Sequence, residues 1–549
     1  MKPLKLPVSR WLLAALAVLA IASGIDNLNR PLANPDEGRY SEISREIVVS
    51  GDWITPRLDG IKYFEKPPLQ YWATAVAFEA FGMNEPAARL YVWLAGFATL
   101  LIVGFTGMRL FGLETGLASA LALVASPYFM AFGGIVTLDM GLTLWTTATF
   151  AALLLAEHAH ERPREQRLWM LVSWAAMALA VLSKGLVGIV FAGAAVFFVM
   201  ATARSAKILR RMHWGWGLAI FAVIAAPWFV AVSRANPEFA HFFFIHEHFE
   251  RFLTHEHRRV QPAWFFIPIV LAGFLPWLAA LPVAIARGWR AEAGASFQPL
   301  RISLLWSGFI LLFFSASGSK LPAYVLPLFP SLALVLGRFL ATGEARRLAL
   351  CLVLVAPVGI AIAYAGAGLP ASAKDSWTQA LYVNTQPWIY AAGAIVAVSC
   401  AGLAAMLLAG HRWASLVGAA FATVMMIECL ENGYEELSPR QSGITVAHAM
   451  APLVTPSTRL YSVAHYDQTL PFYLGRTLKL VDYVDEFETG QKAEPGCCIA
   501  RLEDLAPDWL RPGEALAIMQ PGAFEKLKAL GLPMQVLHDD PRRVIVRKP

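Results

Sequence analysis

Two short stretches, ANPDEGRY at residues 33–40 and YFEKPPLQYW at residues 63–72, decide how the rest of this chain is interpreted. They are dense in acidic, basic and aromatic residues, although only 15% of the whole chain is charged. One short apolar segment precedes them and a long series of apolar segments follows them. In a membrane protein, ionisable groups gathered in this way indicate a functional site. The simpler alternative is a polar loop whose charges are solvated.

The acidic pair Asp36 and Glu37 is expected to lie in the first turn of a helix. Asn34-Pro35 marks a break in the chain, and the helix dipole favours negative charge directly after such a break. Apolar residues then recur at roughly helical spacing as far as Val49. This pattern predicts a short helix that lies at the membrane interface and does not cross the bilayer.

The composition predicts a polytopic α-helical membrane protein. Of the 549 residues, 57% are hydrophobic, and the mean hydropathy is +0.52. Many windows reach the length of about 20 residues that spans a bilayer. The formal charge is +6, which we interpret as an orientation signal and a contact for anionic lipids. The sequence has no basic stripe interleaved with stacking aromatics, so no nucleic-acid partner is expected.

About thirteen membrane spans are expected from the apolar windows. The first, from Trp11 to about Gly24, resembles a signal peptide, and we expect it to remain as an uncleaved span. Basic residues before it place the N-terminus in the cytoplasm. The other twelve are expected at about residues 87–111, 115–132, 136–157, 167–183, 185–202, 214–233, 263–286, 301–316, 321–340, 346–368, 388–409 and 412–429.

The positive residues of alternate loops support this count, because cytoplasmic loops are enriched in Lys and Arg. These residues cluster at 162–167, 204–211, 287–301, 346–347 and 412. The unusual polar residues then gather on the opposite, extracytoplasmic side. That side receives the loops 26–86 and 234–262, the span ends near 139, 184 and 320, and everything after about residue 430.

Residues 1–430 are expected to form the transmembrane domain, and residues 431–549 a small extracytoplasmic α/β domain. Its composition predicts strands at 459–464, 477–481, 515–519, 536–537 and 544–546, with helices at 468–474 and 524–530. It has no glycine-rich nucleotide fingerprint. The vicinal pair Cys497-Cys498 lacks a second pair at metal-ligand spacing, so a zinc ribbon is not expected. The oxidation state of this pair is left open.

Candidate site residues recur on the extracytoplasmic side. The first loop supplies Asp36, Glu37, Tyr40, Tyr63, Glu65 and Lys66. Asp139 lies at the outer end of a span, where an acid needs a partner or a cavity. Its alternative role is that of a helix cap, together with Thr137.

The histidine-rich segment at residues 241–259 could bind a divalent metal through His246, with Glu65 as a carboxylate ligand. Two histidines in a His-x-His pattern point apart on a helix, and the order His-Glu-x-x-His is absent. A metal, either zinc or Mg/Mn, therefore remains one of two interpretations. Arg251 is the better candidate here, as a phosphate ligand, because guanidinium pairs bidentately with phosphate oxygens.

The stretch SGSKLPAY at residues 317–324 is a further candidate anion site, since a short Gly/Ser loop presents Lys320 ahead of a span. The alternative is a plain connecting turn. Lys184 has a similar alternative, as a side chain that snorkels to the interface. The cations and carboxylates together suit a lipid-linked phosphate processed at the outer face. No Walker-type loop is present, so an energy-rich bond in a lipid carrier would drive the reaction.

These motifs resemble a known family. Asp36-Glu37, the stretch YFEKPP at 63–68, Asp139 and the stretch KLPAY at 320–324 are similar to the ArnT family of bacterial 4-amino-4-deoxy-L-arabinose transferases of lipid A. This family belongs to the GT-C group of polyprenyl-phosphate-sugar glycosyltransferases. The acidic pair alone is a weak signal, whereas the second and last motifs together are fairly specific. The resemblance covers most of the chain, including the C-terminal domain.

The resemblance implies a role for each candidate residue. Asp36 matches the essential acid, with Asp139 as its acidic helper and Glu65 as a further catalytic carboxylate. Lys66 and Arg251 would hold the carrier phosphate, with Tyr63, Lys320 and Tyr324 beside it. Tyr40 and Glu37 would contact substrate, and Glu65 with His246 would hold the metal.

The resemblance also implies the reaction and its place. An undecaprenyl-phosphate-linked donor and a lipid A acceptor would meet at the periplasmic face of the inner membrane, on a monomeric, inverting enzyme. Adding a cationic sugar to lipid A would weaken binding of polymyxin and other cationic peptides.

The acceptor decides what Asp36 does. A hydroxyl acceptor needs a general base, and Asp36 would suit. A phosphate monoester is already anionic near neutral pH, since its second pKa is about 6. For lipid A, Asp36 would instead pair with the sugar ammonium or stabilise developing oxocarbenium charge. The alternatives are a GT-C transferase that moves another sugar to a protein or glycan, and a lipid-linked-sugar transporter. A transporter is disfavoured because inverted repeats are absent.

Overall fold

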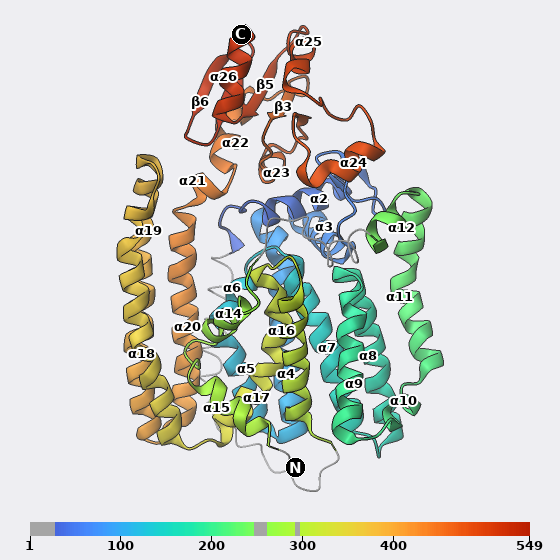
Figure 1. Cartoon of the computed structure of the whole chain (residues 1–549), viewed down its shortest axis with the longest axis vertical. Coiled ribbons are helices and arrows are strands. Elements are labelled where there is room, and N and C mark those ends of the chain that lie inside the picture. The colour runs from blue at the N-terminus through green and yellow to red at the C-terminus, as the bar shows by residue number, and fades with distance from the viewer. Residues whose placement is uncertain (1–27, 246–260, 291–296) are drawn as a thin grey trace.

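Long helices stand side by side below a small sheet domain in the computed structural model, which describes residues 28–245, 261–290 and 297–549 (Figure 1). Within these ranges, nine helical segments are long and apolar enough to cross a membrane. They comprise α4 (Glu85–Phe111), α7 (Leu138–His158), α8 (Pro163–Lys184), α11 (Trp214–Ala235), α16 (Pro299–Ala316), the 3-10 helix η2 (Pro322–Leu328) with α17 (Phe329–Thr342), α18 (Ala345–Gly368), α19 (Ser376–Leu408) and α20 (Arg412–Glu435). The predicted polytopic helical fold is therefore confirmed, while the predicted first span lies outside the described residues.

Three further expected spans are shorter or broken. The segment expected at 185–202 is α9 (Val187–Ala203), of 17 residues. The segment expected at 115–132 is divided into α5 (Leu113–Val124) and α6 (Pro127–Phe132), and that expected at 263–286 into α14 (Phe266–Gly273) and α15 (Ala280–Gly288). Pro127 and Pro276 lie at these two breaks and have no N–H to continue a helix.

The two breaks meet inside the bundle. The Ser126 hydroxyl caps the start of α6 and donates a hydrogen bond of 2.5 Å to the carbonyl of Gly273, the last residue of α14. Phe329 at the start of α17 stacks on both Tyr128 and Phe274, with ring centroids 5.0 and 4.8 Å apart. Backbone groups released by a broken helix need partners inside the protein, and Ser126 supplies one here.

Between the spans and the sheet domain lie α2 (Asp36–Ser50), a hairpin of β1 (Arg57–Leu58) and β2 (Ile61–Lys62), and α3 (Leu69–Phe81) (Figure 1). The short helix predicted after Asp36 is present. It does not lie at a lipid interface, however, because every residue from Tyr40 to Ile47 is buried against protein. Several of its charged residues form ion pairs, such as Glu42 with Arg45 at 2.6 Å.

The C-terminal domain contains the predicted strands in a five-stranded sheet of order β4-β3-β5-β7-β6. β3 (Arg459–Val463) pairs in parallel with β4 (Lys479–Val481) and β5 (Ala515–Met519), whereas β7 (Val544–Arg547) is antiparallel to β5 and to β6 (Gln535–Asp539). Helices α22 (Ile444–Met450), α23 (Leu470–Leu474), α24 (Glu488–Ala493), α25 (Leu505–Trp509) and α26 (Pro521–Ala529) accompany it. The thiols of Cys497 and Cys498 are free in the structure, with their sulfur atoms 3.0 Å apart.

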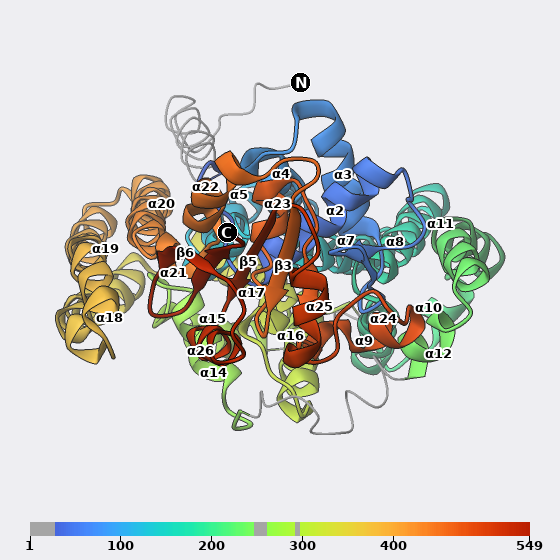
Figure 2. The same ribbon diagram turned by 90° about the horizontal axis from the view of Figure 1, so that it is seen from above.

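Seen from above, the C-terminal domain covers the middle of the bundle (Figure 2). Helices α18, α19 and α20 form one end of the molecule, and α8, α9 and α11 form the other. The short α10 (Lys207–Arg210) and α12 (Phe239–His241) lie at opposite ends of α11 (Figure 1). The remaining short helix, α21 (Ser438–Gln441), leads from α20 into the C-terminal domain.

Candidate functional site

The two neighbouring acids at the start of α2 have opposite environments. The Asp36 side chain is 39% exposed, whereas that of Glu37 is 2% exposed. Asp36 Oδ1 accepts a hydrogen bond of 2.8 Å from Arg39, one turn further along the helix. Arg39 also forms an ion pair with Glu486 of the C-terminal domain. Asp36 is thus an accessible carboxylate whose position is fixed by a cation held from above.

Glu37 is an internal anchor of the site. Its two oxygens accept hydrogen bonds of 2.8 and 2.9 Å from Arg89 of α4, and further ones of 3.0 Å from the backbone N–H groups of Ala33 and Val136. Burial would raise the pKa of Glu37, but the charges of Arg89 and Arg30 and these hydrogen bonds outweigh burial and lower the pKa to about 2. These contacts give Glu37 a positioning role and leave little of it accessible to a substrate.

A second group lies around Tyr63, Glu65 and Lys66. Tyr63 is buried, and its hydroxyl has no hydrogen-bond partner within the described part of the chain. Burial raises the pKa of Tyr63 well above its usual value, and the charge of Glu65 adds to this shift. Lys66 Nζ lies 2.9 Å from the backbone carbonyl of Glu65 and 3.8 Å from its carboxylate.

This second group adjoins the first. The charge of Arg39 lowers the pKa of Tyr63, and the charge of Glu65 raises the pKa of both Tyr63 and Tyr40. Burial raises the pKa of Tyr40 well above its usual value, with Asp36 as the next contributor. Residues 23 or more positions apart in the sequence therefore lie around one region beside α2, where Tyr40 and Tyr63 belong to the same buried cluster.

A third group lies at the ends of the spans nearest the C-terminal domain (Figure 1). Lys184, the last residue of α8, forms an ion pair of 2.5 Å with Asp139 in the first turn of α7. The Lys184 ammonium also lies 4.8 Å from the ring centroid of Tyr324 in η2, a distance suited to a cation–π contact. The alternative of a snorkelling Lys184 is thus replaced by a specific pairing, because Asp139 needs a cation at this depth.

The third group is tied to the first through Glu37. The backbone N–H of Val136, which donates to Glu37, is three residues before Asp139. Tyr40, Tyr63, Val136 and Leu138 also belong to one cluster of buried apolar residues. Asp36 and Asp139 are therefore held on a common rigid frame, although they come from separate elements.

Lys320 has a local role in the structure. Its side chain is 8% exposed, and its ammonium donates a hydrogen bond of 2.7 Å to the carbonyl of Ser317 in its own loop. The Ser319 hydroxyl beside it is buried without a partner among the residues described. Lys320 stabilises the turn that positions η2 and Tyr324, which favours the connecting-turn interpretation.

Two predicted site residues, His246 and Arg251, lie outside the described residues. In the rest of the chain, no group of three or more His, Cys, Asp or Glu side chains is arranged to hold a metal. The site residues that sequence reasoning missed are Arg39, Arg89 and Glu486. A signal existed for Arg39, because an acid and an arginine at positions i and i+3 of a helix face each other. No local signal could have paired Arg89 or Glu486 with this loop.

Two family models match separate parts of the chain, one near each end. Residues 446–548 match a family model described as the aminoarabinose transferase C-terminal domain. Residues 8–243 match the model of dolichyl-phosphate-mannose-protein mannosyltransferases. An undecaprenyl phosphate-alpha-4-amino-4-deoxy-L-arabinose arabinosyl transferase from Sodalis glossinidius is 37% identical over 333 residues. That alignment covers 60% of this chain and 58% of the relative, so it spans little more than half the length of the curated protein.

Solved structures match along the whole chain. ArnT from Cupriavidus metallidurans, crystallised with undecaprenyl phosphate, is 33% identical with a TM-score of 0.93, and the match covers 99% of both chains. An archaeal oligosaccharyltransferase from Archaeoglobus fulgidus shares the fold at a TM-score of 0.51 and 13% identity. Because the first match extends over both the bundle and the C-terminal domain, the chain belongs to the ArnT family.

Proposed function

We propose that this protein is a bacterial inner-membrane glycosyltransferase that moves 4-amino-4-deoxy-L-arabinose from undecaprenyl phosphate to a phosphate group of lipid A. The observation that carries this proposal is the likeness over 99% of the chain to an ArnT structure that contains undecaprenyl phosphate. The names of the curated relatives point to the same donor. The proposed outcome for the cell is resistance to polymyxin and other cationic peptides.

The proposed reaction places the donor in front of α2. An oxygen of the acceptor phosphate attacks the anomeric carbon of the sugar, and the bond from that carbon to the carrier phosphate breaks. The carrier phosphate leaves as an anion, so it needs cations more than an acid. Lys66 from the first loop is our candidate for this task, together with Arg251 from outside the described residues.

Asp36 is proposed to face the sugar. Its accessible carboxylate would pair with the sugar ammonium or stabilise developing oxocarbenium charge, since an anionic phosphate needs no general base. Asp139, Lys184 and Tyr324 are proposed to shape the neighbouring wall, and Tyr40, Tyr63 and Glu65 the region between them. Glu65 remains the carboxylate that would meet a divalent metal, if His246 completes such a site.

The proposed orientation places the N-terminus in the cytoplasm and the site and C-terminal domain in the periplasm. The basic clusters at 204–211 and 346–347 support this orientation, because both lie at the end of the bundle opposite the C-terminal domain (Figure 1). Residues 1–430 are proposed as the membrane-embedded catalytic domain and 431–549 as the periplasmic domain, working as a monomer.

The test is mass spectrometry of lipid A from a host that makes the donor but lacks its own transferase. Wild-type protein, Asp36→Asn and the control Glu79→Gln, an exposed acid of α3, would be expressed at equal levels. We expect the aminopentose on lipid A with the wild type and the control, and its loss with Asp36→Asn. Lipid A that stays unmodified with wild-type protein would contradict the proposed acceptor.

A second candidate is transfer of a sugar to a protein. The match of residues 8–243 to the protein mannosyltransferases favours it. This alternative requires a general base for a hydroxyl acceptor, so its rate would fall steeply at acidic pH as the base becomes protonated. Transfer to the anionic phosphate of lipid A would fall less, since its acceptor needs no base.

A further inference from the structure

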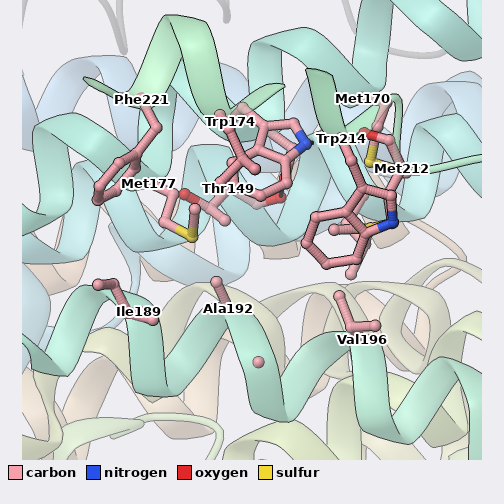
Figure 3. A pocket seen from close by; sticks show the side chains of 14 residues that line it. Thr149, Met170, Trp174, Met177, Ile189, Ala192, Val196, Met212, Trp214 and Phe221 are labelled. Atoms are coloured by element: carbon pink, nitrogen blue, oxygen red, sulfur yellow. Dashed lines mark hydrogen bonds between the residues drawn. The ribbon is translucent and has the colours of Figure 1, made fainter. Parts of the chain in front are cut away.

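An apolar groove opens between α8, α9 and α11, and it contains none of the proposed site residues. Figure 3 shows that Trp174, Met177, Trp214 and Phe221 point into it from one side, and the α9 side chains from the other. Its volume is about 360 Å³, and almost all of its lining is hydrocarbon, indole or thioether. In a protein that crosses a membrane, such a groove is in contact with lipid chains.

The groove runs along the bundle from one surface toward the middle of the membrane. On α9 its lining extends from Ile189 to Val196, eight residues that span about 10 Å along an α-helix. The end of the groove that opens at the surface, its surface end, lies at Met212 and Trp214, at the start of α11 and next to α10. Trp214 and Trp216 are 47% and 63% exposed there. Tryptophan is enriched at headgroup level, so this end of the groove opens among lipid headgroups.

Exposed cations surround the surface end of the groove. Arg204, Lys207 and Arg210 lie on the segment that leads from α9 to α11, and none of them forms an ion pair with a described residue. Arg167 in the first part of α8 lies 5.8 Å from the ring centroid of Trp216. An apolar groove that ends among exposed cations complements a lipid that has a negative headgroup.

Hydrogen bonds and close packing hold the surface end of the groove in place. The indole N–H of Trp174 donates a hydrogen bond of 2.9 Å to the carbonyl of Met212, and that of Trp214 donates one of 2.8 Å to Leu209. His213 is held at 2.9 Å by Gln166 of α8. Gly217 allows α11 to approach Trp174, since an added Cβ would lie 2.2 Å from the indole nitrogen. The cationic segment is therefore fixed beside the groove.

We propose that this groove binds an anionic phospholipid, with an acyl chain along α9 and its phosphate among Arg204, Lys207 and Arg210. The proposal goes beyond the proposed transferase function and rests on it only for the place of the donor's phosphate. The donor's phosphate is assigned to Lys66 at the opposite end of the bundle, so the headgroup at this end belongs to a different lipid. Bound between α9 and α11, the acyl chain fills a gap between helices that are otherwise joined through α8.

The test uses one variant for the groove and another for the cations. Gly193 lines the groove, and an added Cβ there would meet no atom within 4 Å. Gly193→Phe therefore fills the groove without disturbing the helix contacts. A matched control is Gly402→Phe, at an exposed position of α19 where an added Cβ likewise has open space. The second variant replaces Arg204, Lys207 and Arg210 together by Gln.

The full-length proteins would be offered phosphatidylglycerol and phosphatidylcholine in equal amounts, and the retained lipid identified by native mass spectrometry. We expect preferential retention of phosphatidylglycerol by wild type and Gly402→Phe, and a several-fold loss with Gly193→Phe. The loss for the cation variant should reach about fivefold per cation at low salt, as expected for basic residues at an anionic surface.

Equal retention of the two lipids by wild type would overturn the proposal, and so would unchanged retention by Gly193→Phe. A polyprenyl phosphate as the lipid retained from native membranes would overturn it too. Gel filtration with fluorescence detection checks that each variant folds. The cation variant, which leaves the apolar packing intact, decides the question if Gly193→Phe does not fold.

Discussion

Single side chains at this site are divided between structural and accessible roles. Asp36 and Glu37 are neighbours in sequence, yet one is accessible and the other is enclosed by Arg89 and backbone N–H groups. The sequence drew attention to the pair, but it could not show which acid is accessible and which is enclosed. The division depends on Arg89 and Val136, which reach Glu37 from 52 and 99 residues away.

We predict that Glu37→Gln destabilises the protein by about 3–5 kcal/mol, because it leaves the buried Arg89 guanidinium without its counter-charge. Asp36→Asn should abolish transfer with little change in stability, since Asp36 is partly exposed.

The stabilisation that Glu37 supplies should also depend on pH. Because folding lowers the pKa of Glu37 to about 2, its contribution to the free energy of unfolding is complete above the pKa of an unfolded glutamate, about 4.3, and is lost as pH falls toward 2. Denaturant unfolding in detergent at several pH values measures this. Equal stability of the two variants would refute the division of roles.

The pair of Asp139 and Lys184 leads to a second prediction at this scale. Either Asp139→Asn or Lys184→Met alone should destabilise the protein, by about 3–5 kcal/mol, because each leaves one buried charge unpaired. The double variant should recover most of the lost stability without recovering transfer. A double-mutant cycle of unfolding free energies, with lipid A modification measured in parallel, checks both statements. Additive losses in the double variant would show that the two residues do not interact.

At the scale of elements, the length of the apolar segments predicted most of the helices but did not reveal where two of the expected spans are broken. The strands at 459–463 and 515–519 and the helix boundary at Lys184 agree with expectation. The breaks near Pro127 and Pro276 were hidden, because the flanking segments are apolar enough to read as continuous spans. The burial of α2 was also missed. A sequence shows that α2 carries both charged and apolar residues, but only the fold places the C-terminal domain on top of it.

Burial of α2 encloses an acidic group that should make stability depend on pH. Glu42, Glu46 and Asp59 lie together with one guanidinium, that of Arg45. Burial, followed by repulsion from Glu42, raises the pKa of Glu46 well above its usual value, and burial has the same effect on Asp59. The folded protein therefore binds more protons than the unfolded chain once pH exceeds the unfolded pKa values, about 4. Its stability falls as pH rises toward the folded pKa values.

We predict that Asp59→Asn, which imitates the protonated acid, stabilises the protein at pH 8 and flattens this dependence. One oxygen of Asp59 accepts a 2.7 Å hydrogen bond from Leu478, and the other has no partner in the described part of the chain. The amide can therefore keep the useful contact. The matched control is Asp52→Asn in the same loop, where the acid is outside this group. Thermal unfolding from pH 5 to pH 9 is the measurement, and an unchanged pH dependence in Asp59→Asn would contradict the assignment.

At the scale of the whole molecule, α2 forms ion pairs both with the helix bundle and with the C-terminal domain. Arg89 of the bundle holds Glu37 from below, while Glu486 holds Arg39 from above. Asn34 adds two contacts to the C-terminal domain, at 2.9 Å to Asp467 and 3.1 Å from the backbone N–H of Thr469. The C-terminal domain thus fixes the region around Asp36 without supplying a proposed reacting group.

Gly38 provides the sharpest test of this arrangement. A Cβ at this position would lie 2.5 Å from two backbone atoms, the carbonyl carbon of Gln468 and the nitrogen of Thr469. Gly38→Ala must therefore push the C-terminal domain away from α2, because backbone cannot yield as a flexible side chain can. Overpacking of this kind costs about 1–3 kcal/mol. We predict that this variant remains folded in the membrane but loses most of its transfer activity. The ion pair between Glu486 and Arg39 would weaken, and with it the hydrogen bond from Arg39 that positions Asp36.

Hydrogen exchange should show the cause directly, as faster exchange in α2 and at residues 467–469 with unchanged exchange in α18 and α19. Gly402→Ala is the control, because its added methyl meets no neighbour and removes a flexible residue from a helix. Full activity of Gly38→Ala would mean that the close approach of the C-terminal domain is not needed for transfer. Lost activity without faster exchange in α2 would place the effect of Gly38 inside the first turn of the helix, at Asp36 itself.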